Sequence, residues 1–479
     1  MRFHEFLTRP GWTLRWRGDE LDATQAARRC RQAILALRAQ PPVPESLSIF
    51  VAFSPIEVVI ALFVISHEGL LATIVTPRAV ASAMQGFDTG TTRLLMTEGR
   101  PIPPVLQGCQ VVRLPYAAPP ASSNDDGAPL APSAQPARIV FSSSGTTGRP
   151  KRIVHDEERL VANAARVTAY LGLTASDRTL CAFPVNYMYG LSTTLCTLHS
   201  GSAIDYIDFV DSRLVAVEAE RRGTTILPIL GDWCVGLAQQ WARSSFVSAD
   251  LRILNASDRL TVDHVRALRP HCGAIWNNFG QTEAGPRLFA IDVSSIEDFT
   301  RFEHDGAISA GYPMQAEIET RIADANYDGI GRLFYRSPYA MLGFLKSDLA
   351  LVPAPEWIES GDHFRRDWDG LHSWAGRTSH LVKINGQLIS LHAVADSLCG
   401  LHGVSGVGYA KTKEGVLVLF LEAADVAATQ AERLALERIV EPIIPGFNFR
   451  LKFLPKLPRT ESGKIDHRSL AQRIHLETI

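Results

Sequence analysis

The sequence predicts an α/β protein with a large, multi-layered N-terminal domain of sheets and helices and a small α+β C-terminal domain. Its 479 residues are too many for one compact core, so two or three domains are expected. Strand-like and helix-like patterns alternate as far as about residue 290, which is typical of a largely parallel sheet. From residue 307 the chain is richer in strands. We place the domains at residues 1–377 and 378–479.

Composition and charge place the chain among ordinary globular proteins. Hydrophobic residues make up 46% and charged residues 20%, and the net charge is −2. This near-neutral balance gives no electrostatic reason to expect nucleic acid or an anionic membrane as a partner. The seven cysteines form no C-x-x-C pair, and the start of the chain lacks the apolar region of a signal peptide. We therefore predict reduced thiols and a cytoplasmic location.

Residues 47–65 are apolar enough to require a check for a membrane span. Pro55 and Glu57 would both be costly inside a bilayer. A buried strand followed by a helix fits better, with Ser54 as the N-cap and Pro55 at the first helical position. A further strand at 71–75 completes a predicted βαβ unit.

The remaining elements follow from hydrophobic periodicity and turn residues. Helices are predicted at 23–38, 157–171 and 425–440, and strands at 92–96, 111–114, 137–141, 202–207, 224–227, 251–253, 274–276, 316–322, 331–335 and 415–420. Residues 116–136 are rich in Ala, Pro, Ser, Asn and Asp and lack apolar periodicity, so we predict an exposed connection there.

The segment directly after the strand at 137–141 is the most informative part of the chain. It concentrates hydroxyls, glycines and one cation, and we select from it Ser143, Ser144, Gly145, Thr146, Thr147, Gly148 and Lys151. Glycines let backbone N–H groups converge on one point, which suits a polyphosphate. The segment is not a Walker A loop, because Arg149 follows Gly148 where that motif requires lysine. A solvated surface turn is the alternative.

Four further motifs are spread along the rest of the chain. They are Asn255-Ala256-Ser257-Asp258, Asn277-Asn278-Phe279-Gly280-Gln281-Thr282-Glu283, the pair Gly361-Asp362 and Gly376-Arg377, and Leu457-Pro458-Arg459-Thr460-Glu461-Ser462-Gly463-Lys464. In this order and spacing, the five motifs together resemble the adenylate-forming superfamily, which includes acyl- and aryl-CoA ligases, adenylation domains of peptide synthetases and firefly luciferase. The resemblance extends over roughly residues 45 to 470. It implies a mobile C-terminal lid and a reaction in two steps, formation of an acyl-AMP and transfer of the acyl group to a thiol.

The resemblance also implies roles for individual residues toward ATP. The hydroxyl- and glycine-rich loop would hold the β- and γ-phosphates, and Phe279 would face the adenine, although a core aromatic is the alternative for Phe279. Asn278 and Gly280 would complete the base pocket together with Ser257 and Asp258. Asp362 would accept hydrogen bonds from the ribose, and Arg377 would contact the ribose or a phosphate.

Three residues are the predicted catalytic group. Thr282 would donate to the α-phosphate, and Glu283 would be the ligand of Mg²⁺, which favours one or two carboxylates plus phosphate oxygens. Lys464 would bridge the substrate carboxylate and the α-phosphate, because both carry negative charge and repel each other. Ser379 stands where relatives often have the Asp or Lys of an interdomain hinge, and Lys383 resembles a lysine that some relatives use in the second step.

The acid is expected to meet Tyr187, Met188 and Gly190. Met188 stands where amino-acid-activating domains have an Asp, and its thioether could not pair with a buried ammonium. The segment looks most like that of benzoate-type CoA ligases, so we expect an aromatic or unsaturated carboxylic acid.

The acyl acceptor is left open between CoA and a separate acyl carrier protein, since both present the same pantetheine arm. No phosphopantetheine-serine motif follows residue 470, so a free-standing enzyme is expected. A homodimer is compatible with the sequence. The alternatives are an amino-acid-activating enzyme, a non-catalytic nucleotide-binding homologue, a luciferase-like oxygenase and a P-loop phosphotransferase.

Overall fold

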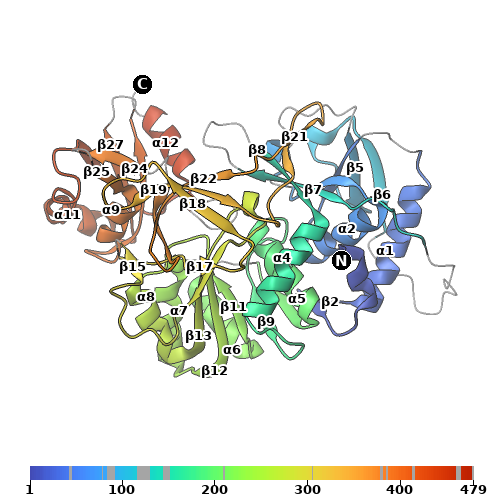
Figure 1. Ribbon diagram of the computed structural model, residues 1–479, viewed down its shortest axis with the longest axis horizontal. Helices are drawn as coiled ribbons and strands as arrows, with labels where there is room; N and C mark the ends of the chain where they lie inside the picture. Colours follow the sequence, from blue (N-terminus) through green and yellow to red (C-terminus); the bar gives the residue numbers. More distant parts are fainter. Residues whose placement is uncertain are drawn as a thin grey trace.

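Two large sheets with helices between and around them make up most of the computed structural model (Figure 1). The structure describes residues 1–41, 46–77, 79–83, 92–115, 130–143, 151–208, 211–304, 306–377, 381–384, 387–412, 416–459 and 465–476. The mixed α/β class predicted from the sequence is confirmed. In the described ranges, no helix has the length and apolar character needed to cross a membrane.

The first large sheet has eight strands in the order β21-β20-β8-β7-β4-β3-β5-β6. Their bounds are β3 (Leu47–Val51), β4 (Leu71–Val75), β5 (Thr92–Thr97), β6 (Gln110–Leu114), β7 (Arg138–Ser143), β8 (Lys151–Asp156), β20 (Gly343–Leu345) and β21 (Leu351–Pro353). The strands from β7 to β6 are parallel, whereas β8 runs antiparallel to β7. The hydroxyl- and glycine-rich loop therefore connects two neighbouring antiparallel strands.

The second large sheet has nine strands in the order β17-β14-β13-β12-β11-β9-β10-β1-β2. Their bounds are β1 (Thr13–Trp16), β2 (Asp19–Asp22), β9 (Arg178–Cys181), β10 (Ala203–Tyr206), β11 (Ile226–Ile229), β12 (Ser248–Ala256), β13 (Cys272–Phe279), β14 (Phe289–Asp292) and β17 (Tyr312–Pro313). The strands from β1 to β13 are parallel. Parallel strands end at one edge, so the motifs that follow β12 and β13 are brought together.

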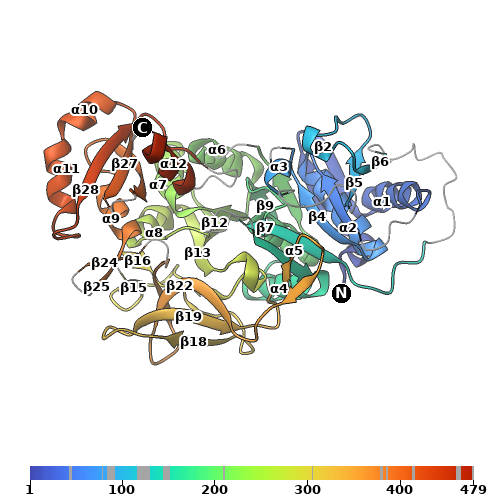
Figure 2. The same cartoon turned by 90° about the horizontal axis from the view of Figure 1, so that it is seen from above.

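Helices surround the two large sheets. They are α1 (Ala23–Arg38), α2 (Pro55–Glu68), α3 (Val80–Ala83), α4 (Glu157–Tyr170), α5 (Met188–Ser200), α6 (Ser212–Arg222), α7 (Cys234–Ser244) and α8 (Val262–Leu268), with 3₁₀ turns at η1 (Phe3–Thr8), η3 (Pro104–Leu106), η4 (Gly231–Trp233), η5 (Arg269–His271) and η6 (Thr282–Ala284). The helices α4 and α5 lie between the two large sheets, and α6, α7 and α8 lie on the far side of the second (Figures 1 and 2). One continuous hydrophobic core joins both sheets through these helices.

A smaller antiparallel sheet follows in the chain, as the strand-rich pattern beyond residue 307 predicts. It contains β18 (Glu319–Ala323), β19 (Ile330–Arg336), β22 (Ile358–Arg366) and β23 (His372–Arg377), with a two-stranded ladder of β15 (Glu303–His304) and β16 (Ala307–Ile308) nearby. Phe364 and Tyr335 of this sheet pack with Phe289 of the second large sheet in a shared cluster. The ends of β22 and β23 are thereby held over the end of β13.

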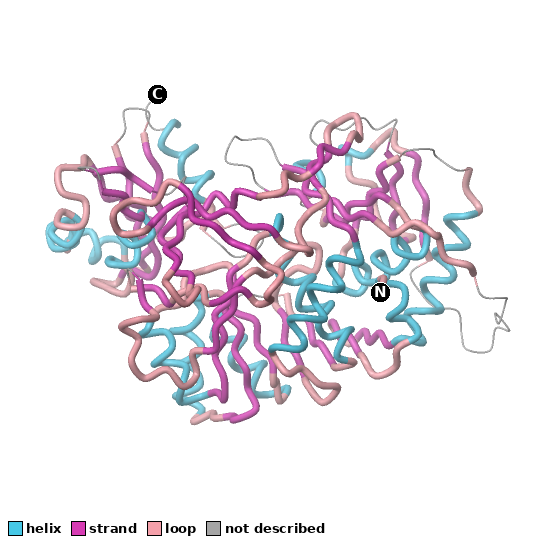
Figure 3. The backbone as a smooth tube through the Cα atoms, viewed as in Figure 1, coloured by secondary structure: helices cyan, strands magenta, loops and turns pink. Residues whose placement is uncertain are grey.

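The chain after residue 380 has hydrophobic clusters of its own. Its elements are β24 (Leu381–Ile384), β25 (Gln387–Ser390), α9 (Leu391–Leu398), β26 (Val404–Lys411), β27 (Leu417–Ala423), α10 (Val426–Ala431), α11 (Arg433–Val440), β28 (Phe449–Leu454) and α12 (His467–Leu476). This mixture of strands and helices lies at the end of the molecule opposite α1 (Figures 2 and 3).

Local sequence signals explain several of these elements. The helix predicted at 23–38 has those bounds, with Asp22 and Gln25 forming a capping box. Ser54 caps α2 by accepting a hydrogen bond from the Glu57 backbone, as predicted. The single helix predicted at 425–440 is wrong, because the chain breaks at Glu432 into α10 and α11. Residues 116–129 of the predicted connection lie outside the described residues. All seven cysteines are free.

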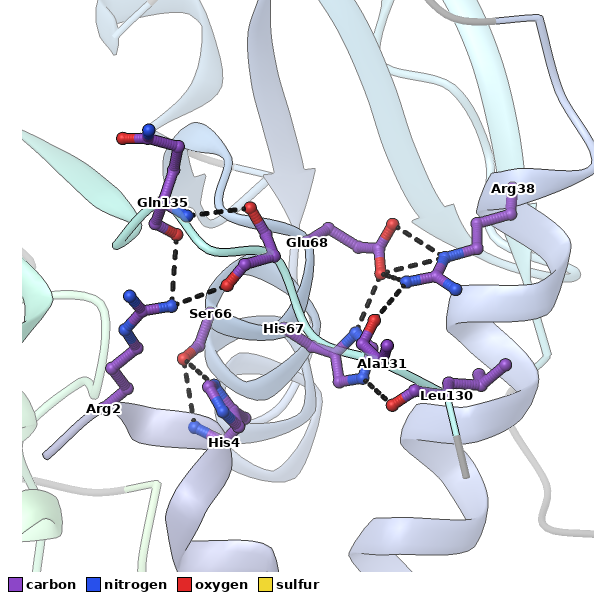
Figure 4. Close-up of polar contacts among 10 residues, drawn as sticks. Arg2, His4, Arg38, Ser66, His67, Glu68, Leu130, Ala131 and Gln135 are labelled. Carbon is purple, nitrogen blue, oxygen red and sulfur yellow. Dashed lines mark hydrogen bonds and ion pairs between the residues drawn. The ribbon is translucent and has the colours of Figure 1, made fainter. Parts of the chain in front are cut away.

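Polar side chains hold the N-terminal segment against α2 and against the segment before β7 (Figure 4). Arg2 donates to the backbone oxygen of Ser133 at 2.7 Å, and the backbone of His4 donates to the Ser66 hydroxyl at 3.1 Å. The carboxylate of Glu157, fully buried, accepts from the backbone of Phe3 at 3.0 Å and of Ala137 at 2.8 Å. The Glu157 carboxylate thus joins the start of the chain, the residue before β7, and α4.

We predict that Glu157→Ala lowers the free energy of unfolding by about 2–5 kcal/mol, because two buried backbone N–H groups lose their acceptor. Glu158→Ala is the matched control, since the Glu158 carboxylate is half exposed and, among the residues that the structure describes, meets only Arg2, at 3.5 Å. Urea unfolding followed by circular dichroism measures both variants. Equal midpoints for the two variants would contradict the anchoring role.

Candidate active site

The strands β7 and β8 bring the two ends of the hydroxyl- and glycine-rich loop together. Ser143 lies opposite Lys151 and Ser142 opposite Arg152 in the antiparallel register. The ammonium of Lys151 lies 5.9 Å from the ring centre of Phe344, and the residue is exposed. Ser144, Gly145, Thr146, Thr147 and Gly148 lie outside the described residues, so their predicted phosphate contacts stay predictions.

A histidine in β8 ties this loop to the predicted catalytic turn. Nε2 of His155 lies 2.6 Å from the backbone oxygen of Thr282, in η6. Burial lowers the pKa of His155 to about 4, so near neutral pH the ring is uncharged and donates one N–H to that oxygen. The backbone oxygen of Glu283 accepts a second hydrogen bond, from Met341 at 2.9 Å. The turn that carries Thr282 and Glu283 is therefore fixed on both sides.

Phe279 ends β13 with its ring half exposed. It packs edge-on against Phe364, with ring centres 4.8 Å apart, and against Phe289 at 5.7 Å. Gly280 follows, and a Cβ there would lie 1.8 Å from the backbone oxygen of Pro286, so only glycine fits this close approach. The structure thus gives Phe279 one packed face and partial access to solvent.

Asn278 is buried and its amide is engaged inside the protein. Its Nδ2 donates to the backbone oxygen of Asn255 at 3.1 Å, and its Oδ1 accepts from the Tyr170 hydroxyl at 2.6 Å and from Arg287 at 3.3 Å. Because alternate strand residues face opposite sides, Asn278 points toward α4 whereas Phe279 points toward β22.

The turn after β12 contains a residue with a strained backbone. Ser257 adopts a left-handed backbone with φ of 70°. Next to it, the carboxylate of Asp258 accepts from the backbone of Arg259 at 2.8 Å and of Asp232 at 3.2 Å. The turn is thereby joined to η4.

The structure brings the predicted ribose ligands together. Asp362 and Arg377 are direct partners in the β22–β23 register, and Nε of Arg377 lies 3.6 Å from Oδ1 of Asp362. The same carboxylate oxygen accepts from Nε1 of Trp374 at 3.1 Å. Tyr335 connects this pair to the catalytic turn, because its hydroxyl accepts from Gln281 at 2.7 Å. Burial, together with the carboxylates of Glu283 and Asp362, raises the pKa of Tyr335.

The predicted acid segment lies at the start of α5. Tyr187 is the N-cap position, half buried, and Met188 is 8% exposed. Gly190 packs so closely that a Cβ would lie 2.3 Å from the backbone oxygen of Pro184. The ring of Tyr189 packs against Phe183, which stacks on Trp233 of η4 at 5.2 Å. The segment thus borders the same η4 turn as Asp258.

Lys464 lies outside the described residues, but both ends of its loop are placed. Arg459 and Ile465 form a β-bridge, and the backbone of Asp466 donates to Pro458 at 2.8 Å. Nη1 of Arg459 also donates to the carboxylate of Asp232 at 3.1 Å. The base of the Lys464 loop therefore contacts η4 of the N-terminal part of the chain. Ser379 lies outside the described residues, as does the side chain of Lys383.

Sequence reasoning missed His155, Asp232, Tyr335 and Arg287, which connect the motifs to each other. Each belongs to no motif and is recognised only through a tertiary contact. For Arg287 a weak signal existed, since this arginine lies four residues after Glu283, the end of a conspicuous motif, and shortly before the apolar strand β14.

The residues present fit a magnesium ion held mainly by phosphate oxygens. The described parts of the chain contain no cluster of three or more His, Cys, Asp or Glu side chains suited to a metal. The Glu283 side chain is half exposed and makes no hydrogen bond or ion pair with the described residues. At nucleotide sites Mg²⁺ is commonly bound by one or two carboxylates together with phosphate oxygens, and Glu283 can supply one such carboxylate.

Known proteins resemble this chain in sequence and in structure. The 2-succinylbenzoate–CoA ligase of Enterococcus faecalis is 22% identical over 347 residues, which cover 70% of this chain and 69% of that protein. The salicyl-AMP ligase / salicyl-S-ArCP synthetase of Mycobacterium tuberculosis is 24% identical over 418 residues, which cover 82% of this chain and 69% of that protein. The solved structure of the anthranilate CoA ligase AuaEII, in complex with anthranoyl-AMP, superposes with a TM-score of 0.79 at 19% identity. That superposition covers 100% of this chain and 98% of the other, and it supports the fold.

The family of AMP-binding enzymes matches residues 25–345, which is more than half of the chain. This match includes the hydroxyl- and glycine-rich loop and the Thr282–Glu283 turn, the two parts of the site that His155 joins. The chain belongs to the AMP-binding enzyme family.

Proposed function

We propose that this AMP-forming acid–thiol ligase activates an aromatic or unsaturated carboxylic acid and passes it to a pantetheine thiol. The observation that carries the proposal is the hydrogen bond between His155 and Thr282. It fixes the turn predicted to meet the α-phosphate against the strand that leaves the predicted phosphate loop. Such fixed donors stabilise charge in a transition state without reorganising.

In the first step, a carboxylate oxygen of the acid attacks the α-phosphorus of ATP, and the bond to the β-phosphate oxygen breaks with release of pyrophosphate. The loop from Ser143 to Lys151 binds the departing phosphates, and Thr282 donates to the α-phosphate. Glu283 would hold Mg²⁺, and the ion would neutralise phosphate charge. Lys464 lies between the two anionic reactants and offsets their repulsion. The lid formed by residues 378–479 carries Lys464 to the site.

The ribose and base are held by the small sheet and the end of β13. Asp362, 5% exposed, accepts hydrogen bonds from the ribose hydroxyls while Trp374 and Arg377 fix its carboxylate. The half-exposed ring of Phe279 offers the adenine a flat apolar face, because the ring is held by stacking on Phe289 and by the edge-on contact with Phe364.

The acid is a carboxylate without an α-ammonium. Met188 and its neighbours on α5 provide no carboxylate to pair with such a charge, and an unpaired buried ammonium is costly. The names of the succinylbenzoate, salicyl and anthranilate relatives support an aromatic acid. In the second step a thiol attacks the acyl carbon and AMP leaves. The relatives include both a CoA ligase and an enzyme that forms a salicyl-S-ArCP product, so both thiols are candidates.

The test is pyrophosphate exchange into ATP, driven by a panel of benzoates, cinnamates, alkanoates and amino acids, followed by transfer to CoA or a carrier protein. We predict that Lys464→Ala lowers the exchange rate by about 10²–10³-fold, the loss expected for one key electrostatic donor. Lys456→Ala is the control, because Lys456 is exposed in the same part of the chain. Exchange by amino acids above all other acids, or near-normal exchange by Lys464→Ala, would overturn the assignment.

The contact between Asp232 and Arg459 predicts a pH dependence of the first step. Partial burial and the neighbouring Asp258 carboxylate raise the pKa of Asp232 to about 6. The ionised form, which pairs with Arg459, is therefore present above pH 6 and is lost as the pH falls through that value. We predict that Asp232→Asn lowers the rate of adenylation by about two- to fivefold at pH 7.5. This factor corresponds to the free energy that a partly exposed ion pair contributes.

Below pH 6 the rates of wild type and Asp232→Asn should converge, because the wild-type carboxyl is then protonated. Asp208→Asn serves as a matched control that removes a surface pair with Arg17. Pyrophosphate exchange measured from pH 5 to 8 gives the ratio of rates. A ratio that is constant over this range would count against the contact.

A further inference from the structure

Arg287 is a buried arginine beside the predicted acid segment. Only 4% of it is exposed. Its Nη1 donates to the Tyr170 hydroxyl at 2.8 Å and to Oδ1 of Asn278 at 3.3 Å, and its guanidinium carbon lies 6.0 Å from the ring centre of Tyr189. The guanidinium therefore lies among α4, α5 and β13.

The charge of Arg287 has no carboxylate partner in the described residues. The titratable groups around it are Tyr170, Tyr189 and Cys196, and its Nε has no hydrogen-bond partner among the described residues. Three other arginines meet buried carboxylates: Arg178 and Arg222 both contact Asp205, and Arg252 contacts Asp177. Arg93 is buried with only the Ser48 hydroxyl as a side-chain hydrogen-bond partner in the described ranges, but it lies in β5 of the first sheet, away from the predicted acid segment. A buried guanidinium without an anion is costly, so a retained one indicates a partner that the protein does not itself supply.

Arg287 lies on the acid side of β13. It contacts the Asn278 side chain, which faces α4, whereas Phe279 faces β22 on the opposite side of the strand. Its neighbour Tyr189 is in the same helix as Met188. Arg287 also shares one short loop with Thr282, so a compact acid with its carboxylate near Thr282 could reach the guanidinium with its other end.

We propose that Arg287 determines acid specificity by binding an oxygen substituent remote from the reacting carboxylate, either a hydroxyl or a second carboxylate. This inference rests on the proposed function and adds the substrate class: an acid with an oxygen acceptor at its far end. A site built to bond such an oxygen rejects the matched acid that lacks it, because its own polar groups are then left unpaired.

The experiment compares benzoates that carry a hydroxyl, a carboxylate or a methyl group at the same ring position. In wild type, kcat/KM for pyrophosphate exchange with the best oxygen-substituted acid should exceed that of the methyl acid by at least about tenfold. Arg287→Met should bring this ratio close to one, and Arg287→Lys should retain part of it. The hydroxyl and carboxylate series show which oxygen group is bound.

Arg269→Met is the matched control, because Arg269 is half buried and donates to the backbone oxygens of Val293 and Ile296. It should leave the ratio unchanged. An unchanged ratio in Arg287→Met, or an equal loss for all acids, would overturn the inference, whereas exchange by the wild type would still support the proposed function. Calorimetric titration with the same acids, without ATP, tests the preference independently of activity. If no acid supports exchange by the wild type, the proposed function fails, and only a binding preference that Arg287→Met abolishes would show that Arg287 binds the oxygen substituent.

Discussion

The hydrogen bond from His155 to the Thr282 backbone joins the two large sheets at the site. His155 lies in β8 of the first sheet, and Thr282 follows β13 of the second. Because burial keeps the imidazole neutral, the contact persists near neutral pH and adds no positive charge to the site. Gly285 makes this approach possible, since a Cβ there would lie 3.1 Å from Cε1 of His155 and 2.1 Å from the backbone oxygen of Tyr339. The two segments that the proposed function assigns to one nucleotide are thus held together by contacts within the protein.

A second contact joins η4 to the part of the chain after residue 380. Asp232 and Arg459 are both partly exposed, at 42% and 29% of their side-chain surfaces. Partly exposed ion pairs contribute little to stability, which would suit a contact that breaks in the proposed movement of the C-terminal lid. The fully buried carboxylate of Glu157 is the opposite case, and it joins segments that stay together.

The sequence predicted the elements better than the contacts between them. The helix at 23–38 and the βαβ unit around Ser54 follow from caps and periodicity, which are local properties. The break at Glu432 was missed because the apolar spacing continues across it. The motifs marked the ends of β7, β12 and β13, but His155 and Arg287 act through partners more than one hundred residues away in the chain. No local pattern reports such pairs.

In the proposed function, the alternation of side chains along β13 separates the nucleotide from the acid. Phe279 and the aromatic cluster around Phe364 make one side of the strand apolar, whereas Asn278 leads to Tyr170 and Arg287 on the other side. A one-residue shift of register would exchange these faces and bring the polar Asn278 to the side assigned to the adenine. The antiparallel pairing of Phe279 with Phe289 and of Asn278 with Ala290 fixes that register. The same strand that positions Thr282 and Glu283 therefore also determines which side chains each side of the candidate site presents.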